Sequence, residues 1–101
     1  MEKVTVLAFA EVKAEFEEQF LAEIPPLVAA TRAEAACLNY DFHRAADEPN
    51  KFMFYENWTS LAGLEAHARS AHIQRFRANI AEFLAKPIEI KLYQMMTEPA
   101  A

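Results

Sequence analysis

The sequence predicts an α+β fold of the ferredoxin-like type, with the order β-α-β-β-α-β and a four-stranded antiparallel sheet that carries its helices on one face. Two observations predict it. Segments whose apolar residues alternate, as in strands, are separated by segments whose apolar residues recur every three or four positions, as in helices. Six such segments follow one another in the required order. The chain has 101 residues, so we expect a single domain over 1–101 with a loose tail over about 97–101.

The first half of the chain is expected to hold a strand over residues 4–12 and a long helix that starts near Lys13. One face of this helix is apolar, and its members are Phe16, Phe20, Ile24, Leu27, Val28 and Thr31. Pro25 and Pro26 fall inside the pattern and remove backbone donors. We therefore expect a kink, or a fresh helical start near Pro26, with the same apolar face continuing beyond it.

The second half begins with two strands, over residues 37–45 and 51–58, joined by the turn signal Asp47-Glu48-Pro49-Asn50. Ser60 and Ser70 are expected to cap two consecutive helices. The second of these helices has an apolar face formed by Ile73, Phe76, Ile80, Phe83 and Leu84. Pro87 ends it, and a last strand is expected over residues 88–93.

Composition excludes several classes of protein. A net charge of −5 argues against a nucleic-acid partner, which requires a basic face. One glycine excludes a phosphate-binding loop, and one cysteine excludes an internal disulfide. No apolar run is long enough to span a membrane, and the first residues lack the pattern of a secretory signal. We expect a cytoplasmic protein that has no membrane partner and a reduced thiol.

The first and third strands are apolar on both faces, although the helices can cover only one of them. A second copy of the chain, packed sheet against sheet, would cover the other face. The sequence therefore predicts a homodimer through the open face of the sheet.

Three histidines are the main candidates for chemistry. His67 and His72 lie five positions apart, which on a continuous helix would turn them about 140° away from each other. The break near Ser70 would bring them together, but a metal site would still lack a third clear ligand, so no metal is expected. His67 lies at the margin of an apolar stripe, where it faces either solvent or a pocket between helix and sheet. His72 borders the core, and a structural role for it is as plausible as a functional one.

The hairpin supplies a second set of candidates. A polar row can form a cross-strand network, which is either structural or part of an active site; its members are Asn39, Asp41, His43, Tyr55 and Asn57. Trp58 ends the third strand and serves either as core or as one wall of a cavity. Cys37 has no basic neighbour in the sequence and is interpreted as an inert thiol.

In motif form, the hairpin and the helix after it read YDxHR, FxxYExW and HxxSxHxxxF, beginning at Tyr40, Phe52 and His67 respectively. In this order and spacing the motifs resemble the antibiotic biosynthesis monooxygenase family. The resemblance implies a dimeric α+β barrel. In several members it also implies oxygenation of phenolic or quinol substrates without metal, flavin or haem. Relatives often carry Pro-Gly where this chain has Ala35-Ala36. The haem-degrading branch has an Asn in its first strand that this chain lacks, so haem degradation is not expected.

With this resemblance, the sequence is interpreted as a cofactor-independent monooxygenase that oxidises a small hydroxyaromatic or quinol-type substrate with O2. His67 is the expected catalytic base or substrate-orienting group, and His72 is the second candidate. The expected substrate-binding residues are Trp58, Tyr55, Asn57, Phe54, Phe52, Asn39 and His43. Glu56 is expected to orient a histidine or to pair structurally. Two alternatives stay open, an isomerase of a small metabolite and a non-catalytic dimeric module that binds a hydrophobic ligand or serves in stress response.

Overall fold

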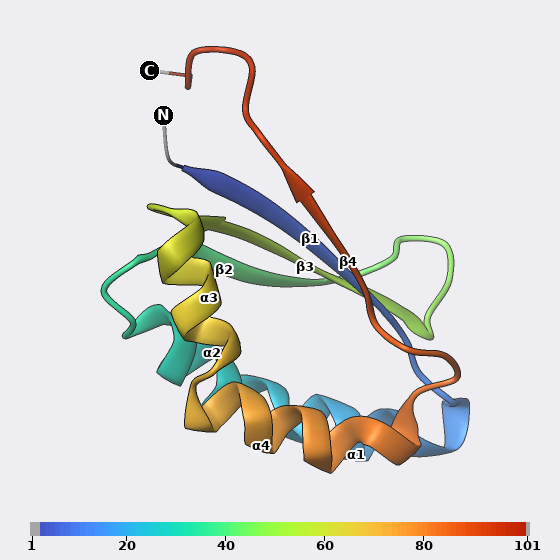
Figure 1. Ribbon diagram of the computed structural model, residues 1–101. Helices are drawn as coiled ribbons and strands as arrows, with labels where there is room; N and C mark the ends of the chain where they lie inside the picture. Colours follow the sequence, from blue (N-terminus) through green and yellow to red (C-terminus); the bar gives the residue numbers. More distant parts are fainter. Residues whose placement is uncertain (1–2, 101) are drawn as a thin grey trace.

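The computed structural model of the protein describes residues 3–100, so residues 1, 2 and 101 of the predicted domain and tail lie outside the described residues. Helices and strands follow the expected order (Figure 1). The elements are β1 (Val4–Glu11), a 3₁₀ turn (Ala14–Phe16), α1 (Glu17–Ala22), α2 (Ile24–Arg32), β2 (Cys37–Arg44), β3 (Lys51–Trp58), α3 (Leu61–Ala68), α4 (Ala71–Ile80), a second 3₁₀ turn (Ala81–Phe83) and β4 (Glu89–Tyr93).

The four strands form one antiparallel sheet in the order β2-β3-β1-β4. All four α-helices lie on the same side of this sheet and leave its other face open (Figure 1). This arrangement confirms the ferredoxin-like fold predicted from the order of the elements. Among the described residues, no helix is long and apolar enough to cross a membrane.

The two consecutive prolines start a new helix. The first helix ends at Ala22, and α2 begins at Ile24 with Pro25 and Pro26 in its first turn. The first turn of a helix leaves its backbone N–H groups without intrahelical partners, so proline costs no hydrogen bond there. The apolar face continues across the break, with Phe20 and Leu27 both buried. Of the two outcomes expected at this site, the fresh start is the one observed.

The helix that was expected to run on to Leu84 ends earlier. The last turn of α4 is at Ile80, a 3₁₀ turn follows, and Leu84 pairs with Val12 in an isolated bridge. Backbone hydrogen bonds from Lys13 N to Phe83 O and from Ala85 N to Glu11 O, at 2.9 and 2.8 Å, hold this segment against the end of β1. Because these N–H and C=O groups pair with extended backbone, the helix does not continue for another turn.

Both predicted serine caps are present. Ser60 Oγ accepts a hydrogen bond from Gly63 N at 3.0 Å, and Ser70 Oγ accepts one from Ile73 N at 3.4 Å. The break between α3 and α4 therefore lies at Ser70, between the two histidines. It turns the chain so that His67 and His72 face one point in space.

Residues of β3 alternate strictly between the two faces of the sheet. Phe52, Phe54, Glu56 and Trp58 are buried under the helices, whereas Tyr55 is exposed on the open face. On β2 the alternation fails at its start. Leu38, two residues before the buried Tyr40, is 56% exposed, because the register shifts between Cys37 and Asn39.

Candidate functional site

A cavity of about 870 Å³ lies between the helical layer and the β1–β4 half of the sheet. Its wall is mostly aliphatic and comes from α3, α4, the segment after α4, and residues of all four strands. Ile90 and Leu92 of β4 line it while remaining about half exposed, at 51% and 50%, so the cavity opens to solvent at this edge. Six polar or charged residues also line it, namely Tyr40, Glu56, Glu65, His67, Arg77 and Lys86.

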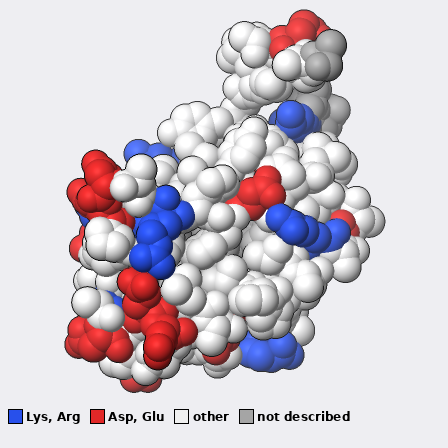
Figure 2. Space-filling model, turned by 180° about the vertical axis from the view of Figure 1, so that it is seen from behind, with Lys and Arg blue, Asp and Glu red and all other residues white. Residues whose placement is uncertain are grey.

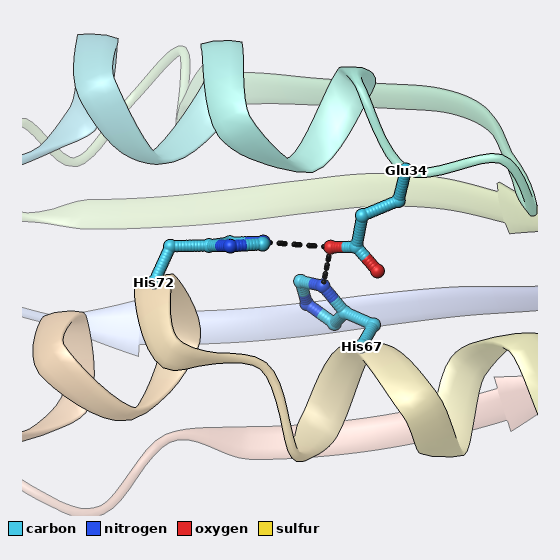
Figure 3. A group of neighbouring side chains, drawn as sticks. All are labelled: Glu34, His67 and His72. Carbon is cyan, nitrogen blue, oxygen red and sulfur yellow. Dashed lines mark hydrogen bonds and ion pairs between the residues drawn. The ribbon is translucent and has the colours of Figure 1, made fainter.

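His67 lines this cavity and also belongs to a compact polar cluster with Glu34 and His72. Its Nδ1 lies 2.7 Å from Oε2 of Glu34, and Nε2 of His72 lies 2.7 Å from the same oxygen. Figure 3 shows the carboxylate of Glu34 between the two imidazoles. The three residues come from different segments, namely the loop after α2, the end of α3 and the start of α4. His67 is 5% exposed, whereas His72 and Glu34 retain partial exposure.

The position of the ring proton on His67 follows from this contact. A carboxylate only accepts hydrogen bonds, so the neutral imidazole donates from Nδ1 to Glu34 and keeps its lone pair on Nε2. Nε2 has no hydrogen-bond partner among residues 3–100. Burial lowers the pKa of His67, opposed by the Glu34 carboxylate and assisted by His72 and Arg77, so the ring is neutral near pH 7.

Ser70 joins the two histidines. Its hydroxyl donates to the backbone oxygen of His67 at 2.7 Å and lies 3.2 Å from Nε2 of His72. Because the same hydroxyl also caps α4, the break between the helices and the placement of the histidines depend on one side chain.

A second polar pair lies on the sheet side of His67. Trp58 donates its indole N–H to Oε1 of Glu56 at 2.9 Å, and the Trp58 ring packs against the His67 ring with centroids 4.7 Å apart. Burial raises the pKa of Glu56 to about 7, against the lowering effect of the Trp58 hydrogen bond. Of the two roles expected for Glu56, the structure shows the structural pairing, because its hydrogen-bond partner is Trp58 and not a histidine.

Tyr40 and Arg77 complete the polar lining near His67. The Tyr40 ring lies 5.7 Å from the His67 ring, and burial raises the pKa of its hydroxyl, which stays protonated. That hydroxyl has no partner among the described residues. Arg77 is exposed, forms no hydrogen bond or ion pair within residues 3–100, and carries its positive charge at the cavity wall.

The predicted site residues fall into two groups. His67 and Phe54 line the cavity. His72 does not line it but contacts Glu34, which in turn contacts His67. Phe52 and Trp58 lie on the same side of the sheet but are core residues, 2% and 0% exposed, and they do not line the cavity.

The other four predicted residues lie across the sheet from His67. Tyr55, Asn57, Asn39 and His43 project from the open face because they alternate with the residues of β2 and β3 that face the helices. Asn57 is nevertheless buried on that face, at 4% exposed. The strand register therefore places these four residues apart from the cavity that His67 lines. On that face Asn57 donates to Asn39 Oδ1 at 2.9 Å, and Asn39 donates to Asp41 Oδ2 at 3.0 Å. Part of the expected cross-strand network is therefore present: Asn39, Asp41 and Asn57 form it, Tyr55 enters only through its backbone oxygen, and within residues 3–100 His43 has no hydrogen bond in it.

Sequence reasoning missed Glu34, Tyr40 and Arg77 as neighbours of His67. Glu34 stands in a stretch of alanines, with no motif spacing that connects it to residues more than thirty positions away. It also supplies the third ligand atom that a metal site was expected to lack. One donor atom each from Glu34, His67 and His72 lies within 4.8 Å of the others. Cys37 behaves as expected, because burial and nearby carboxylates raise the pKa of its thiol.

Comparison with known proteins identifies the family of this chain. The antibiotic biosynthesis monooxygenase family model matches residues 3–79. YcnE of Bacillus subtilis, which bears the provisional name of a monooxygenase, is 34% identical over 87 residues, covering 86% of this chain and 92% of YcnE. An uncharacterised Synechocystis protein, sll1783, is 32% identical over 92 residues, which cover 91% of this chain and 63% of sll1783.

Solved structures agree with the fold. Rv0793 of Mycobacterium tuberculosis superimposes with a TM-score of 0.91 at 26% identity, covering 97% of this chain and 99% of that one. PA3566 of Pseudomonas aeruginosa does so with a TM-score of 0.88 at 29% identity, covering 96% and 97%. The match of the family model over most of the chain shows that this protein belongs to the antibiotic biosynthesis monooxygenase family.

Proposed function

We propose that the protein is a monooxygenase that oxidises a small hydroxyaromatic or quinol-type substrate with O2, with His67 as the base. One observation carries the proposal. His67 presents an unprotonated Nε2 at the wall of an apolar cavity, while Glu34 holds the opposite nitrogen at 2.7 Å. A carboxylate that holds an imidazole in one tautomer and orientation is a recurrent way of preparing a histidine as a base.

The reaction begins when Nε2 removes the hydroxyl proton of the substrate. The resulting electron-rich anion passes one electron to O2, and the substrate radical and superoxide combine to form a carbon–oxygen bond. Loss of water from the peroxide leaves a quinone, so one oxygen atom enters the product and the other leaves as water. The substrate anion itself supplies the electrons. For this reason these reaction steps need no cofactor.

The remaining polar residues have roles that follow from their positions. The Tyr40 hydroxyl stays protonated and can donate a hydrogen bond to the substrate oxygen as it becomes an anion. Arg77 adds a positive charge at the same wall, and the aliphatic lining limits water around the anion. His72 acts as a positioning residue because it holds Glu34 from the other side.

A second function is favoured by Glu56. Its carboxyl group and His67 line the same cavity, and the pKa of Glu56 is raised to about 7, so two groups there can exchange protons near neutral pH. Glu56 as an acid and His67 as a base in the same cavity would suit an isomerase, which moves a proton between two carbons of a small oxygenated metabolite.

Oxygen uptake with a panel of phenols and quinols separates these functions. A monooxygenase consumes one O2 per substrate oxidised. An isomerase converts a carbonyl compound without oxygen uptake and exchanges its proton with solvent deuterium. Saturable binding of the same compounds without either reaction identifies a non-catalytic binding module and refutes the proposal.

We also propose that a second copy of the chain covers the open face of the sheet. Phe9, Tyr55 and Tyr93 lie on that face and are 37%, 41% and 49% exposed, which is unusual for aromatic side chains in a monomer. A dimer would place them, with the network of Asn39 and Asn57, in the interface. The cytoplasmic location stays a prediction from the sequence.

A further inference from the structure

We propose that Glu34, His67 and His72 bind a divalent transition-metal ion such as Zn²⁺, and that this ion switches off His67 as a base. Two imidazole nitrogens and one carboxylate oxygen form a donor set that suits Zn²⁺, Co²⁺ or Fe²⁺. The three atoms lie within 4.8 Å of one another, and among the described residues they form the one group of His, Cys, Asp and Glu side chains that converges in this way.

The geometry is close to what an ion requires. Ligand atoms about 2.1 Å from a tetrahedral metal ion lie about 3.4 Å apart. Each histidine nitrogen lies 2.7 Å from Glu34 Oε2, so each of these two separations must widen by roughly 0.7 Å to seat an ion. Glu34 stands on a loop and His72 in the first turn of α4, where small side-chain rotations suffice.

Access and burial are also suitable. The side chains of Glu34 and His72 are 19% and 21% exposed, which gives an ion a path from solvent, whereas His67 is 6% exposed and anchors the inner side. One water molecule would complete a four-coordinate site. Figure 3 shows that the three side chains approach from three directions, as ligands around a single ion do.

Binding would reverse the tautomer of His67. Without an ion, Nδ1 carries the proton and donates it to Glu34, and Nε2 offers its lone pair to the cavity. An ion takes the lone pair of Nδ1, so the ring proton must sit on Nε2, which can then only donate. The ion and the base therefore exclude each other. The inhibitory part of this inference rests on the proposed function, whereas the binding part does not.

Metal binding is tested on the full chain after treatment with a chelator. Titration with Co²⁺ should give the visible absorption of a four-coordinate ion that saturates at one ion per chain, and Zn²⁺ should displace it. Glu34→Gln and His72→Gln should each weaken binding at least tenfold. His43→Gln is the matched control, because His43 is exposed on the opposite face of the sheet and its loss should leave binding unchanged.

A second readout follows the tautomer directly. Nitrogen NMR of imidazole-labelled protein should show the His67 proton on Nδ1 in the free protein and on Nε2 after Zn²⁺ is added. Failure of Co²⁺ to saturate, or equal weakening by His43→Gln, overturns the site. Binding that leaves an active enzyme uninhibited overturns only the switch. Binding by a protein without oxygenase activity leaves the site standing and removes the proposed function instead.

Discussion

At the scale of single residues, Glu34 and Glu56 are two carboxylates near one histidine that have different tasks. Glu34 accepts hydrogen bonds from two imidazoles and remains partly exposed. Glu56 is 5% exposed and accepts one hydrogen bond from Trp58. Their surroundings make the first an acceptor shared by two imidazoles and raise the pKa of the second to about 7.

Glu56 makes stability depend on pH. Its pKa is 4.5 in the unfolded chain and about 7 in the folded protein, so between these values the folded state binds more protons. The free energy of unfolding contributed by this group is therefore fully present below about pH 4.5 and falls as pH rises through 7, by at most roughly 3 kcal/mol. Glu56→Gln should remove this loss.

Urea unfolding at several pH values between 5 and 8 measures the effect as the difference between wild type and Glu56→Gln. Taking the difference removes the contributions that other titrating groups make to both proteins. One of these is His67, whose lowered pKa makes the free energy of unfolding rise with pH up to about 6.5. Parallel profiles for the two proteins would show that Glu56 titrates normally.

The buried hydroxyl of Thr31 lowers the free energy of unfolding. It is 0% exposed, and its Oγ1 has no hydrogen-bond partner among residues 3–100. Thr31→Val keeps the shape and removes the unpaired hydroxyl, so we expect a gain of roughly 1 kcal/mol in the free energy of unfolding. Thr31→Ser keeps the hydroxyl, loses a methyl group and should destabilise. A loss on Thr31→Val, measured by urea unfolding, would mean that the hydroxyl has a partner.

At the scale of elements, the single glycine explains how α3 approaches the loop before β2. A Cβ on Gly63 would overlap the Cβ of Ala36, and no residue in the described chain has a positive φ. Gly63 is therefore required by close packing and not by backbone conformation. The entry to β2 turns without glycine, and Ala36 O instead accepts a hydrogen bond from Thr59 N at 2.9 Å.

This packing predicts that Gly63→Ala changes stability in opposite directions in two backgrounds. In the wild-type chain, Gly63→Ala should destabilise by about 1–3 kcal/mol because the new methyl group is overpacked. In the Ala36→Gly background the overlap is gone, and Gly63→Ala should stabilise by about 1 kcal/mol through helix propensity. Thermal or urea unfolding of the four proteins completes the cycle. Additive effects would refute the contact.

The elements were largely predictable because their signals are local. Period-two and period-3.6 patterns, the turn at Asp47–Asn50 and the serine caps all lie within a few residues of the structure they specify. The end of α4 was not predictable, because backbone bonds to the distant strand β1 decide it. Glu34 was missed for the same reason, since its two partners come from other elements. The face of Tyr55 and Asn57 follows from the strand alternation, and the resemblance alone did not supply it.

At the scale of the whole molecule, the two faces of the sheet serve different purposes. The helix-covered face holds the cavity and His67, and the open face holds a hydrogen-bonded network flanked by exposed aromatic residues. On the side drawn in Figure 2, basic and acidic side chains lie next to each other. Arg32 forms an ion pair with Asp41, and Arg44 forms one with Glu17. Charge does not divide this side into a basic and an acidic region.

The open face predicts the oligomeric state. Light scattering at micromolar concentration should give twice the 11.5 kDa mass of the chain. Phe9→Glu replaces an exposed aromatic side chain of that face, between Met53 and Glu89 of the neighbouring strands, with a charge and should shift the protein toward monomer. Ala78→Glu, on the exposed side of α4, should not. A monomer in the wild type would contradict the proposed dimer.

We propose that His67 removes the substrate proton, and this is measured most directly as oxygen uptake with a phenol or quinol that the protein accepts as a substrate. His67→Ala should lower the rate at saturating substrate by about 10²-fold or more, the usual contribution of a general base. His43→Ala, which changes an exposed histidine on the other face, should match wild type. Unchanged turnover in a folded His67→Ala protein would contradict the account.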